Sequence, residues 1–154
     1  MEKIAIGVFT AIVISFISSW ITVHLSLRRF RTEKWWEKKV DAYSKVIEAL
    51  HNAKAFSTAN MSAEENAGKI SNSDQTSLRA RTCEANEEIF KAMDVGGFLL
   101  SKDALSSLKQ YRKDATAAEH EQSWYGHLEQ DWAATEKCLK DIIEIAKKDL
   151  KITP

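Results

Sequence analysis

Histidine and cysteine are the side chains of this sequence best suited to metal binding or catalysis, and the chain holds four histidines and two cysteines. Glu48 and His51 have the Glu-x-x-His spacing of di-iron helical bundles, but such a centre uses two of these pairs and further glutamates. His120 and His127 stand seven positions apart, which does not place two ligands on one helical turn. We therefore predict no metal site and no cofactor, and we assign no catalytic residue.

An Arg and a His on the same stretch of sequence form the other candidate for chemistry. Arg112 and His120 are separated by seven residues, the first of which is Lys113. The pair resembles the Arg and His of helical ribonucleases of the HEPN kind, which use a shorter separation and a different polar residue after the Arg. The resemblance implies a divergent RNA-cleaving domain as the enzyme alternative, whereas we expect a protein without enzymatic activity.

The composition excludes several classes of protein. One proline and five glycines in 154 residues argue against a turn-rich β-sandwich or barrel, so an all-helical chain is expected. With 22 basic and 22 acidic side chains the molecule has no overall attraction for nucleic acid, and we predict no nucleic-acid partner. Cys83 and Cys138 lack the C-x-x-C spacing of a metal or redox site and are expected to be reduced thiols.

The beginning of the chain has the composition of a membrane anchor. Ile4 to Leu25 is a run of 22 residues without Asp, Glu, Lys or Arg. At about 1.5 Å per residue such a helix covers roughly 33 Å, enough for a hydrocarbon core of about 30 Å. The run is longer than the apolar part of a signal peptide, and no A-x-A-like cleavage site follows it. Residues 1–27 are therefore predicted to be an uncleaved single-pass anchor in the lipid bilayer.

The charges that flank this run predict its orientation. Leu27 to Lys39 carries six basic and two acidic residues, whereas only Glu2 and Lys3 precede the run. An excess of Lys and Arg marks the cytoplasmic side of a membrane segment. We therefore expect a protein of the cell inner membrane, with the N-terminus outside and the C-terminal domain in the cytoplasm. The side chains predicted to contact lipid headgroups are Arg28, Arg29, Arg31 and Lys34.

Small residues recur along one face of the predicted membrane helix. A strip of small side chains lets the backbones of two helices approach each other closely. The alternative is that Ser and Thr hydroxyls bond back to carbonyls of their own helix. We predict a homo-oligomer whose membrane helices pack through Gly7, Ala11, Ser15, Ser18, Ser19 and Thr22.

The rest of the chain, residues 28–154, repeats apolar residues at helical intervals. The first helix is expected to continue from the membrane to about Ala55, and the second to cover about Thr76–Val95. Ser101 is the predicted N-cap of the third helix, and the fourth ends near Leu150. The predicted fold class is all-α, with an N-terminal transmembrane helix that continues into a cytoplasmic antiparallel four-helix bundle.

Two further expectations concern the inside of this bundle. Residues 57–77 are rich in Ser, Asn, Ala and Glu, and are predicted to form a loop, with the frayed ends of two helices as the alternative. The apolar positions of the four helices are predicted to share one core, made of Trp36, Val40, Tyr43, Ile47, Leu50, Ile89, Leu105, Leu108, Trp132, Leu139 and Ile142.

Three segments of the chain carry a resemblance to a known group: RFRTEKWWEKKVDAYSKVIEAL, EEIFKAMDVGGFLLS and AATEKCLKDIIEIAKKDLKI. They resemble small bacterial single-pass membrane proteins that have a juxtamembrane RxRxEKWWExK-type motif. The resemblance implies an anchored helical module and brings no assigned reaction and no site residues.

These observations favour one class of function and leave two others open. The leading hypothesis is a non-enzymatic, membrane-anchored oligomeric interaction or scaffold module with an unknown protein partner. The second is a membrane-perturbing effector or toxin, as in phage defence, in which the polar part of the small-residue strip opens a leak. The third is the divergent ribonuclease described above.

Overall fold

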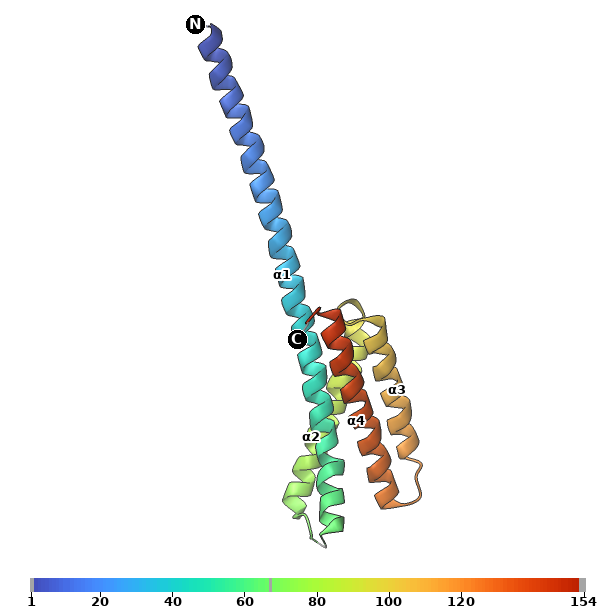
Figure 1. The fold of residues 1–154 in the computed structure, drawn as a ribbon. Helices are drawn as coiled ribbons and strands as arrows, with labels where there is room; N and C mark the ends of the chain where they lie inside the picture. Colours follow the sequence, from blue (N-terminus) through green and yellow to red (C-terminus); the bar gives the residue numbers. More distant parts are fainter. Residues whose placement is uncertain (1, 67, 153–154) are drawn as a thin grey trace. The chain divides into compact units, whose positions relative to one another are not determined.

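The computed structural model describes the backbone of residues 2–66 and 68–152, and the side chains of residues 15, 18–66 and 68–152. These residues form four α-helices and one short 3-10 helix, without a strand. The elements are α1 Glu2–Glu65, α2 Asn72–Val95, η1 Gly96–Phe98, α3 Lys102–Ala118 and α4 Trp124–Asp149 (Figure 1). The prediction of an all-α chain is confirmed.

The chain divides into two compact units, Met1–Glu37 and Lys38–Pro154. The sequence predicted a division after residue 27, ten residues earlier. All side chains of residues 18–38 are exposed, and burial begins at Lys39 and Val40. The packed unit therefore begins where side chains are first covered and not where the apolar run ends.

The described residues of this structure contain no helix long and apolar enough to cross a membrane. The anchor predicted for residues 1–27 lies mostly outside the residues whose side chains are described. Gly7 and Ala11 of the predicted helix-packing strip lie outside them as well.

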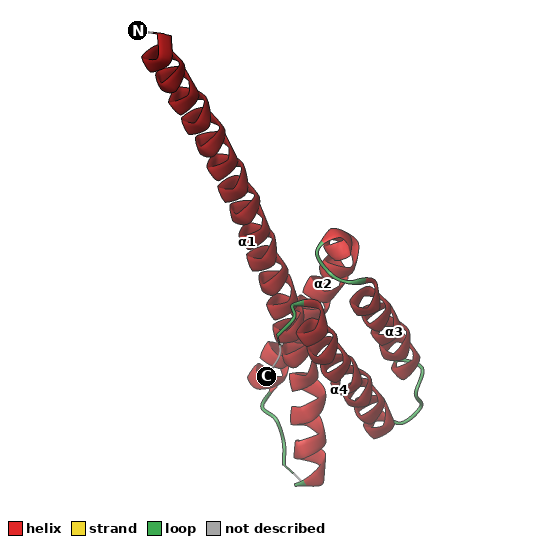
Figure 2. Cartoon of the chain, turned by 45° about the horizontal axis from the view of Figure 1, so that its top comes forward, coloured by secondary structure: helices red, strands yellow, loops and turns green. Residues whose placement is uncertain are grey.

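The second unit is a bundle of the C-terminal half of α1 with α2, α3 and α4. Each helix runs antiparallel to the one before it (Figures 1 and 2). The connections are short, at residues 66–71, 96–101 and 119–123. Short connections between long helices leave no room for a crossover, so consecutive helices must turn back on each other.

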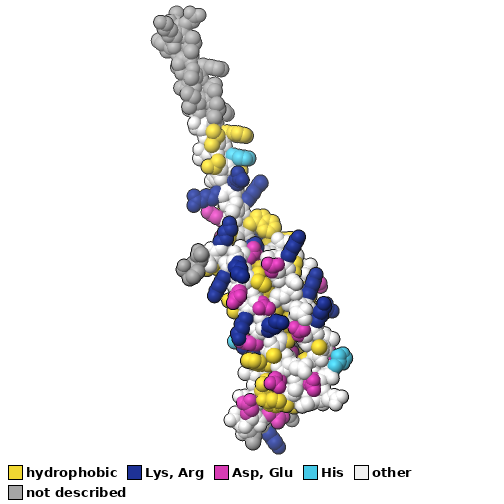
Figure 3. Space-filling view, turned by 45° about the vertical axis from the view of Figure 1, so that its right-hand side comes forward, with side chains coloured by type: hydrophobic (Ala, Val, Ile, Leu, Met, Phe, Trp, Pro, Cys, Tyr) yellow, Lys and Arg dark blue, Asp and Glu magenta, His cyan; other side chains and the backbone are white. Residues whose placement is uncertain are grey.

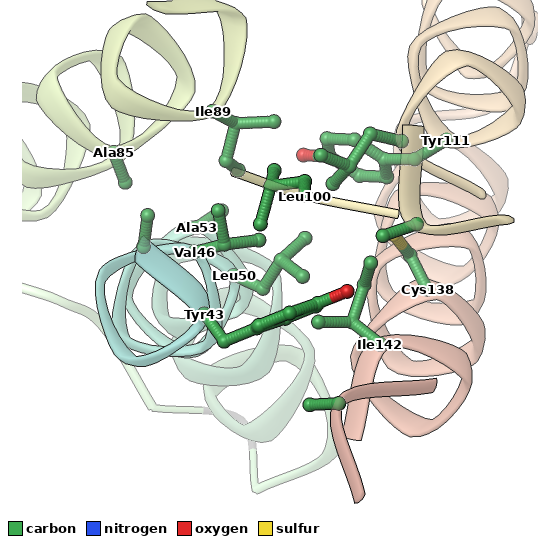
Figure 4. Packing of buried hydrophobic residues seen from close by; sticks show 14 of the residues in the cluster. Tyr43, Val46, Leu50, Ala53, Ala85, Ile89, Leu100, Tyr111, Cys138 and Ile142 are labelled. Carbon is green, nitrogen blue, oxygen red and sulfur yellow. The ribbon is translucent and has the colours of Figure 1, made fainter. Parts of the chain in front are cut away.

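Apolar side chains from all four helices fill the centre of the bundle. In Figure 4, α1, α2 and α4 send side chains into one shared space, where Leu100 also lies. The fully covered aliphatic side chains, each 0% exposed, are Leu50, Ile89, Leu108, Leu128 and Ile142. Burial of each of these side chains contributes about 1.5–3 kcal/mol, which makes this core the main source of the bundle's stability.

The predicted core residues are distributed over three levels of burial. Tyr43 joins the aliphatic residues above as a buried side chain, at 1% exposure, and Trp132 is half-buried. Partly buried side chains that pack against the core are Val40, Ile47, Leu105 and Leu139. Trp36 is 50% exposed, so its assignment to the core is wrong. It continues the apolar spacing of the helix, but it precedes Lys38, where the packed unit begins.

The prediction that residues 57–77 form a loop is wrong for most of that segment. α1 continues to Glu65 and α2 begins at Asn72, so only residues 66–71 connect them. The polar residues that suggested a loop are used inside the fold. Ser57 is buried and donates a hydrogen bond to Asp131 of α4, and Asn60 accepts one from Gln75 of α2 at 3.0 Å.

Polar contacts also fix the end of the bundle at which α1 enters it. The Tyr43 hydroxyl donates to Asp149 Oδ2 at 2.8 Å and accepts from the Ser101 backbone N–H at 3.2 Å. Lys39 Nζ lies 2.7 Å from the other oxygen of Asp149. One hydroxyl thus joins α1, the start of α3 and the end of α4.

The turn between α2 and α3 depends on a close approach of the chain to itself. The carbonyl of Gly96 accepts hydrogen bonds from the N–H groups of Leu99 and Leu100 at 2.9 and 2.8 Å. A Cβ atom at Gly96 would lie 2.9 Å from Leu100 Cδ1, and Leu100 is buried. Glycine therefore allows this turn to place Leu100 in the core.

Candidate functional site

Residues 18–36 of α1, which we call the exposed α1 segment, present large apolar side chains to the surroundings. Their exposed fractions run from 49% to 71%, and they are Trp20, Ile21, Val23, Leu25, Leu27, Phe30, Trp35 and Trp36. In Figure 3 hydrophobic side chains are followed along this segment by basic ones. Exposed apolar surface on this scale is typical of membrane or protein interaction sites.

The charges of the exposed α1 segment are partly paired along the helix. Arg29 Nε lies 3.1 Å from Glu33 Oε1, and Lys34 Nζ lies 2.6 Å from Glu37 Oε2. Arg28 and Arg31 make no ion pair with any described residue. Of the four residues predicted to contact lipid headgroups, these two are therefore the ones whose charge is not already paired within the described residues, and both can bind an external anion.

The described residues of the small-residue strip are exposed on α1. Thr22 Oγ1 donates to the carbonyl of Ser18 at 2.8 Å, which is the bond within one helix that the sequence left open. Ser15, Ser18 and Ser19 are exposed. Packing of these residues between two helices stays a prediction.

A cleft of about 350 Å³ lies in the bundle and is lined by all four helices. α1 contributes Phe56 and α4 contributes His127 and Asp131. The lining residues from α2 are Arg79, Thr82, Cys83, Asn86 and Phe90. Those from α3 are Tyr111, Arg112, Ala115 and Thr116, and Glu119 follows directly after the end of α3. This volume is within the range of small-molecule sites, roughly 300–1,000 Å³.

Two guanidinium groups of this cleft rest on aromatic rings. Arg112 Cζ lies 5.0 Å from the centre of the Phe90 ring, and Arg79 Cζ lies 5.8 Å from the centre of the Phe56 ring. Neither forms an ion pair with a described residue. A guanidinium stacked on a ring keeps its N–H edge available to bind a carboxylate or phosphate with two hydrogen bonds.

Asp131 and His127 form the α4 side of the cleft. Burial raises the pKa of Asp131 above its ordinary value, and the hydrogen bond from Ser57 and the proximity of His127 offset part of that increase. His127 Nδ1 donates to the carbonyl of Ala118 at 2.8 Å, because a carbonyl can only accept.

Three polar groups in the floor of the cleft differ in how they are satisfied. Tyr111 donates its hydroxyl proton to Asn86 Oδ1 at 2.9 Å, and burial raises the pKa of Tyr111 to about 12. The oxygen of Thr82 is buried and makes no hydrogen bond to a described residue. A buried hydroxyl without a partner costs about 1–3 kcal/mol, so its presence calls for a physical reason.

The structure separates the residues that the sequence considered for catalysis. Arg112 lines the cleft, but His120 is exposed in the connection after α3 and is not part of the lining. His127 lies there instead, on α4. Nothing in the spacing of Arg112 and His127 could have indicated this, because their proximity depends on how α3 and α4 pack.

The histidines considered for metal binding lie apart from each other. Glu48 and His51 are exposed on α1, and His120 is exposed while His127 is half-buried. Among the residues whose side chains are described, no three His, Cys, Asp or Glu are placed to hold a metal ion.

A second groove, of about 520 Å³, lies between α1 and the end of α2. Its apolar residues include Val95 and Phe98, which are 57% and 65% exposed. Lys45 on its rim is paired with Asp41 at 2.8 Å. The groove thus combines exposed apolar side chains with charges of both signs.

The two cysteines have different surroundings and neither forms a disulfide. Cys83 is exposed on the wall of the cleft, and Cys138 is buried in the core. Burial raises the pKa of Cys138 to about 11. Only Cys83 is accessible to a thiol reagent in the folded bundle.

Comparison of the chain with protein-family models, with curated proteins and with solved structures finds no match to any of them.

Proposed function

We propose that this chain is a membrane-anchored helical interaction module, held in the cell inner membrane by residues 4–25 and carrying its bundle in the cytoplasm. The observation that carries the proposal is the exposed α1 segment. Its large apolar side chains begin inside an uncharged run of 22 residues, and its two arginines that form no ion pair with a described residue follow that run. Apolar surface followed by cationic surface is suited to a bilayer with anionic headgroups.

Alkaline carbonate extraction of cell membranes tests the anchor. We expect the full chain to stay in the membrane pellet and to be released by detergent. A variant that begins at residue 28 is the control and should appear in the supernatant. Recovery of the intact full chain in the aqueous fraction would refute the proposal.

Labelling of Cys83 tests the orientation. Cys83 is exposed, whereas a buried thiol such as Cys138 reacts too slowly to report on sidedness. A membrane-impermeant maleimide should label Cys83 in broken cells and not in intact cells. Labelling in intact cells would place the bundle on the outer side.

The small-residue strip is proposed to hold the membrane helices of two or more copies together. Replacing Gly7 and Ala11 with Ile should lower the yield of crosslinked oligomer, because the added side chains keep the helix backbones apart. The matched control is Ile6→Leu, which changes a large residue of the same helix into another. Equal crosslinking of all three proteins would contradict self-association through this strip.

The bundle is the part of the molecule proposed to meet a cytoplasmic protein partner. Purification in mild detergent from native membranes should recover that partner in a fixed ratio with the full chain, and not with a chain that ends at residue 37. A full chain that purifies with itself alone would leave a self-assembling scaffold as the function.

A further inference from the structure

We propose that the cleft lined by the four helices binds a small organic anion that has a planar apolar body. Its negative group would lie against Arg112, and its body against Phe90 and Ala115. This site is independent of the membrane anchor, because all its residues belong to the bundle unit.

The charges of the cleft are distributed unevenly along its length. On α2 the lining extends from Arg79 to Phe90, eleven positions that cover about 16 Å of helix. Arg112 rests on the ring of Phe90, at one end of this stretch. Glu119, the residue that caps the end of α3, lies seven positions after Arg112, about 10 Å along the helix axis.

The carboxylates gather at the opposite end, near Arg79. Arg79 rests on Phe56, and the adjacent residue of α1, Ser57, donates to Asp131. Glu119 is close enough to Asp131 to oppose its ionisation. Both carboxylates of the lining, Glu119 and Asp131, therefore lie together, and Arg112 is the cation of the cleft without a nearby carboxylate in the lining. An anion is attracted to the Arg112 end.

The surface beside Arg112 fits a planar body. Phe90 and Ala115 offer apolar contact, and the guanidinium lies over the face of the Phe90 ring, so its N–H groups point outward along its edge. This arrangement binds a carboxylate or a phosphate through two parallel hydrogen bonds.

A side-chain amide supplies the second observation. Asn86 lines the cleft and uses its Oδ1 to accept from Tyr111, which leaves its amide N–H groups as donors. A polar atom of the ligand can accept from this amide. The Thr82 oxygen takes no part, because almost none of its surface is open to the cleft.

Isothermal titration of the full chain in detergent micelles tests the proposal. The probes are phenyl phosphate, benzoate and, as a cation of the same shape, benzylamine. We expect saturable binding of the anions and at least about tenfold weaker binding of benzylamine, since a charged hydrogen bond is lost and replaced by repulsion. The tighter of the two anions identifies the group that Arg112 prefers.

Two substitutions separate a ligand site from a structural role. Arg112→Met keeps the side-chain stem and removes the charge, and should weaken the tighter anion about tenfold or more. Arg81→Met is the control, because Arg81 lies on α2, outside the lining, and bonds to Asn52.

Three results would overturn the proposal. These are the absence of saturable binding for both anions, equal affinity of Arg112→Met and Arg81→Met, and binding of benzylamine as tight as that of the anions. Circular dichroism of each variant confirms that it is folded. Arg112→Lys keeps the positive charge but loses the two parallel N–H donors of the guanidinium, so it should bind the anion with an intermediate affinity.

Discussion

At the residue scale, the bundle depends on a few polar side chains placed where helices meet. Tyr43 is the clearest case, since its ring is in the core at 1% exposure and its hydroxyl reaches Asp149 and the backbone of Ser101. A tyrosine at an apolar position of a sequence pattern is indistinguishable from a core phenylalanine. The role of its hydroxyl depends on the tertiary structure, which brings the start of α3 and the end of α4 beside it.

Tyr43→Phe is expected to destabilise the bundle by about 1–2 kcal/mol. The substitution keeps the ring in the core and removes one hydrogen bond to a carboxylate, while the Ser101 N–H loses its acceptor. Urea unfolding of the detergent-solubilised chain measures the change. Tyr125→Phe is the control, because the Tyr125 hydroxyl makes a longer contact, 3.2 Å, with exposed Glu65. An equal effect of both substitutions would show that the Tyr43 hydroxyl contributes nothing specific.

The ionisation of Asp149 predicts part of the acid sensitivity of the fold. Its partial burial would raise its pKa, but the hydrogen bonds from Lys39 and Tyr43 and the charge of Lys39 hold the pKa below the ordinary value. A carboxyl with a lowered pKa stabilises the folded state above its unfolded pKa, near 4, and this contribution is lost as the pH falls through the folded pKa. Asp131 has the opposite shift and the opposite sign, since its raised pKa favours folding at low pH.

Comparison of wild type with Asp149→Asn isolates the Asp149 contribution. Asp131 is present in both proteins and cancels. Between about pH 6 and about pH 3 the melting temperature of the wild type should fall further than that of Asp149→Asn. Parallel curves for the two proteins would mean that Lys39 and Tyr43 do not favour the charged carboxylate.

At the element scale, helix ends were predicted best where a serine caps the helix. Ser101 was expected to cap the third helix, and its Oγ accepts a hydrogen bond from the N–H of Ala104 at 3.2 Å. The end of α1 was predicted worst. Local composition suggested a loop at residue 57, but burial of Ser57 and Asn60 keeps the helix going to Glu65.

Ser101→Ala should cost about 1 kcal/mol of stability, because the first turn of α3 loses the acceptor for one of its N–H groups. Ser106→Ala is the matched control. Ser106 is exposed inside the same helix, where alanine is the better helix former, so this change should be neutral or slightly stabilising. Thermal unfolding followed at 222 nm compares the two, and equal melting temperatures would remove Ser101 as a cap.

At the scale of the whole molecule, the chain consists of two units that obtain their stability differently. The bundle buries its own core, whereas the exposed α1 segment presents its apolar side chains outward. Helical propensity alone gives little stability to a helix in water, so a segment like this one is suited to surroundings that cover it.

Removal of residues 1–27 should therefore leave the bundle folded. The melting temperature of the shortened chain is expected to stay within about 2–4 °C of the full chain, the shift that 1 kcal/mol causes in a chain of this size. Calorimetry of both proteins in the same detergent makes the comparison. A much larger fall would mean that the bundle draws stability from the first unit.

The sequence by itself was enough for the all-α class, for the start of α3 and for most of the core positions. These features follow from local rules, since helical spacing, the scarcity of glycine and proline, and capping serines act within a few residues. The tertiary structure decided where the packed unit begins, which polar residues of α1 are buried, and that Arg112 and His127 line the same cleft. Such features depend on contacts between side chains that are distant in sequence. A helical pattern predicts which face of a helix is apolar, but it does not predict which other segment will cover that face.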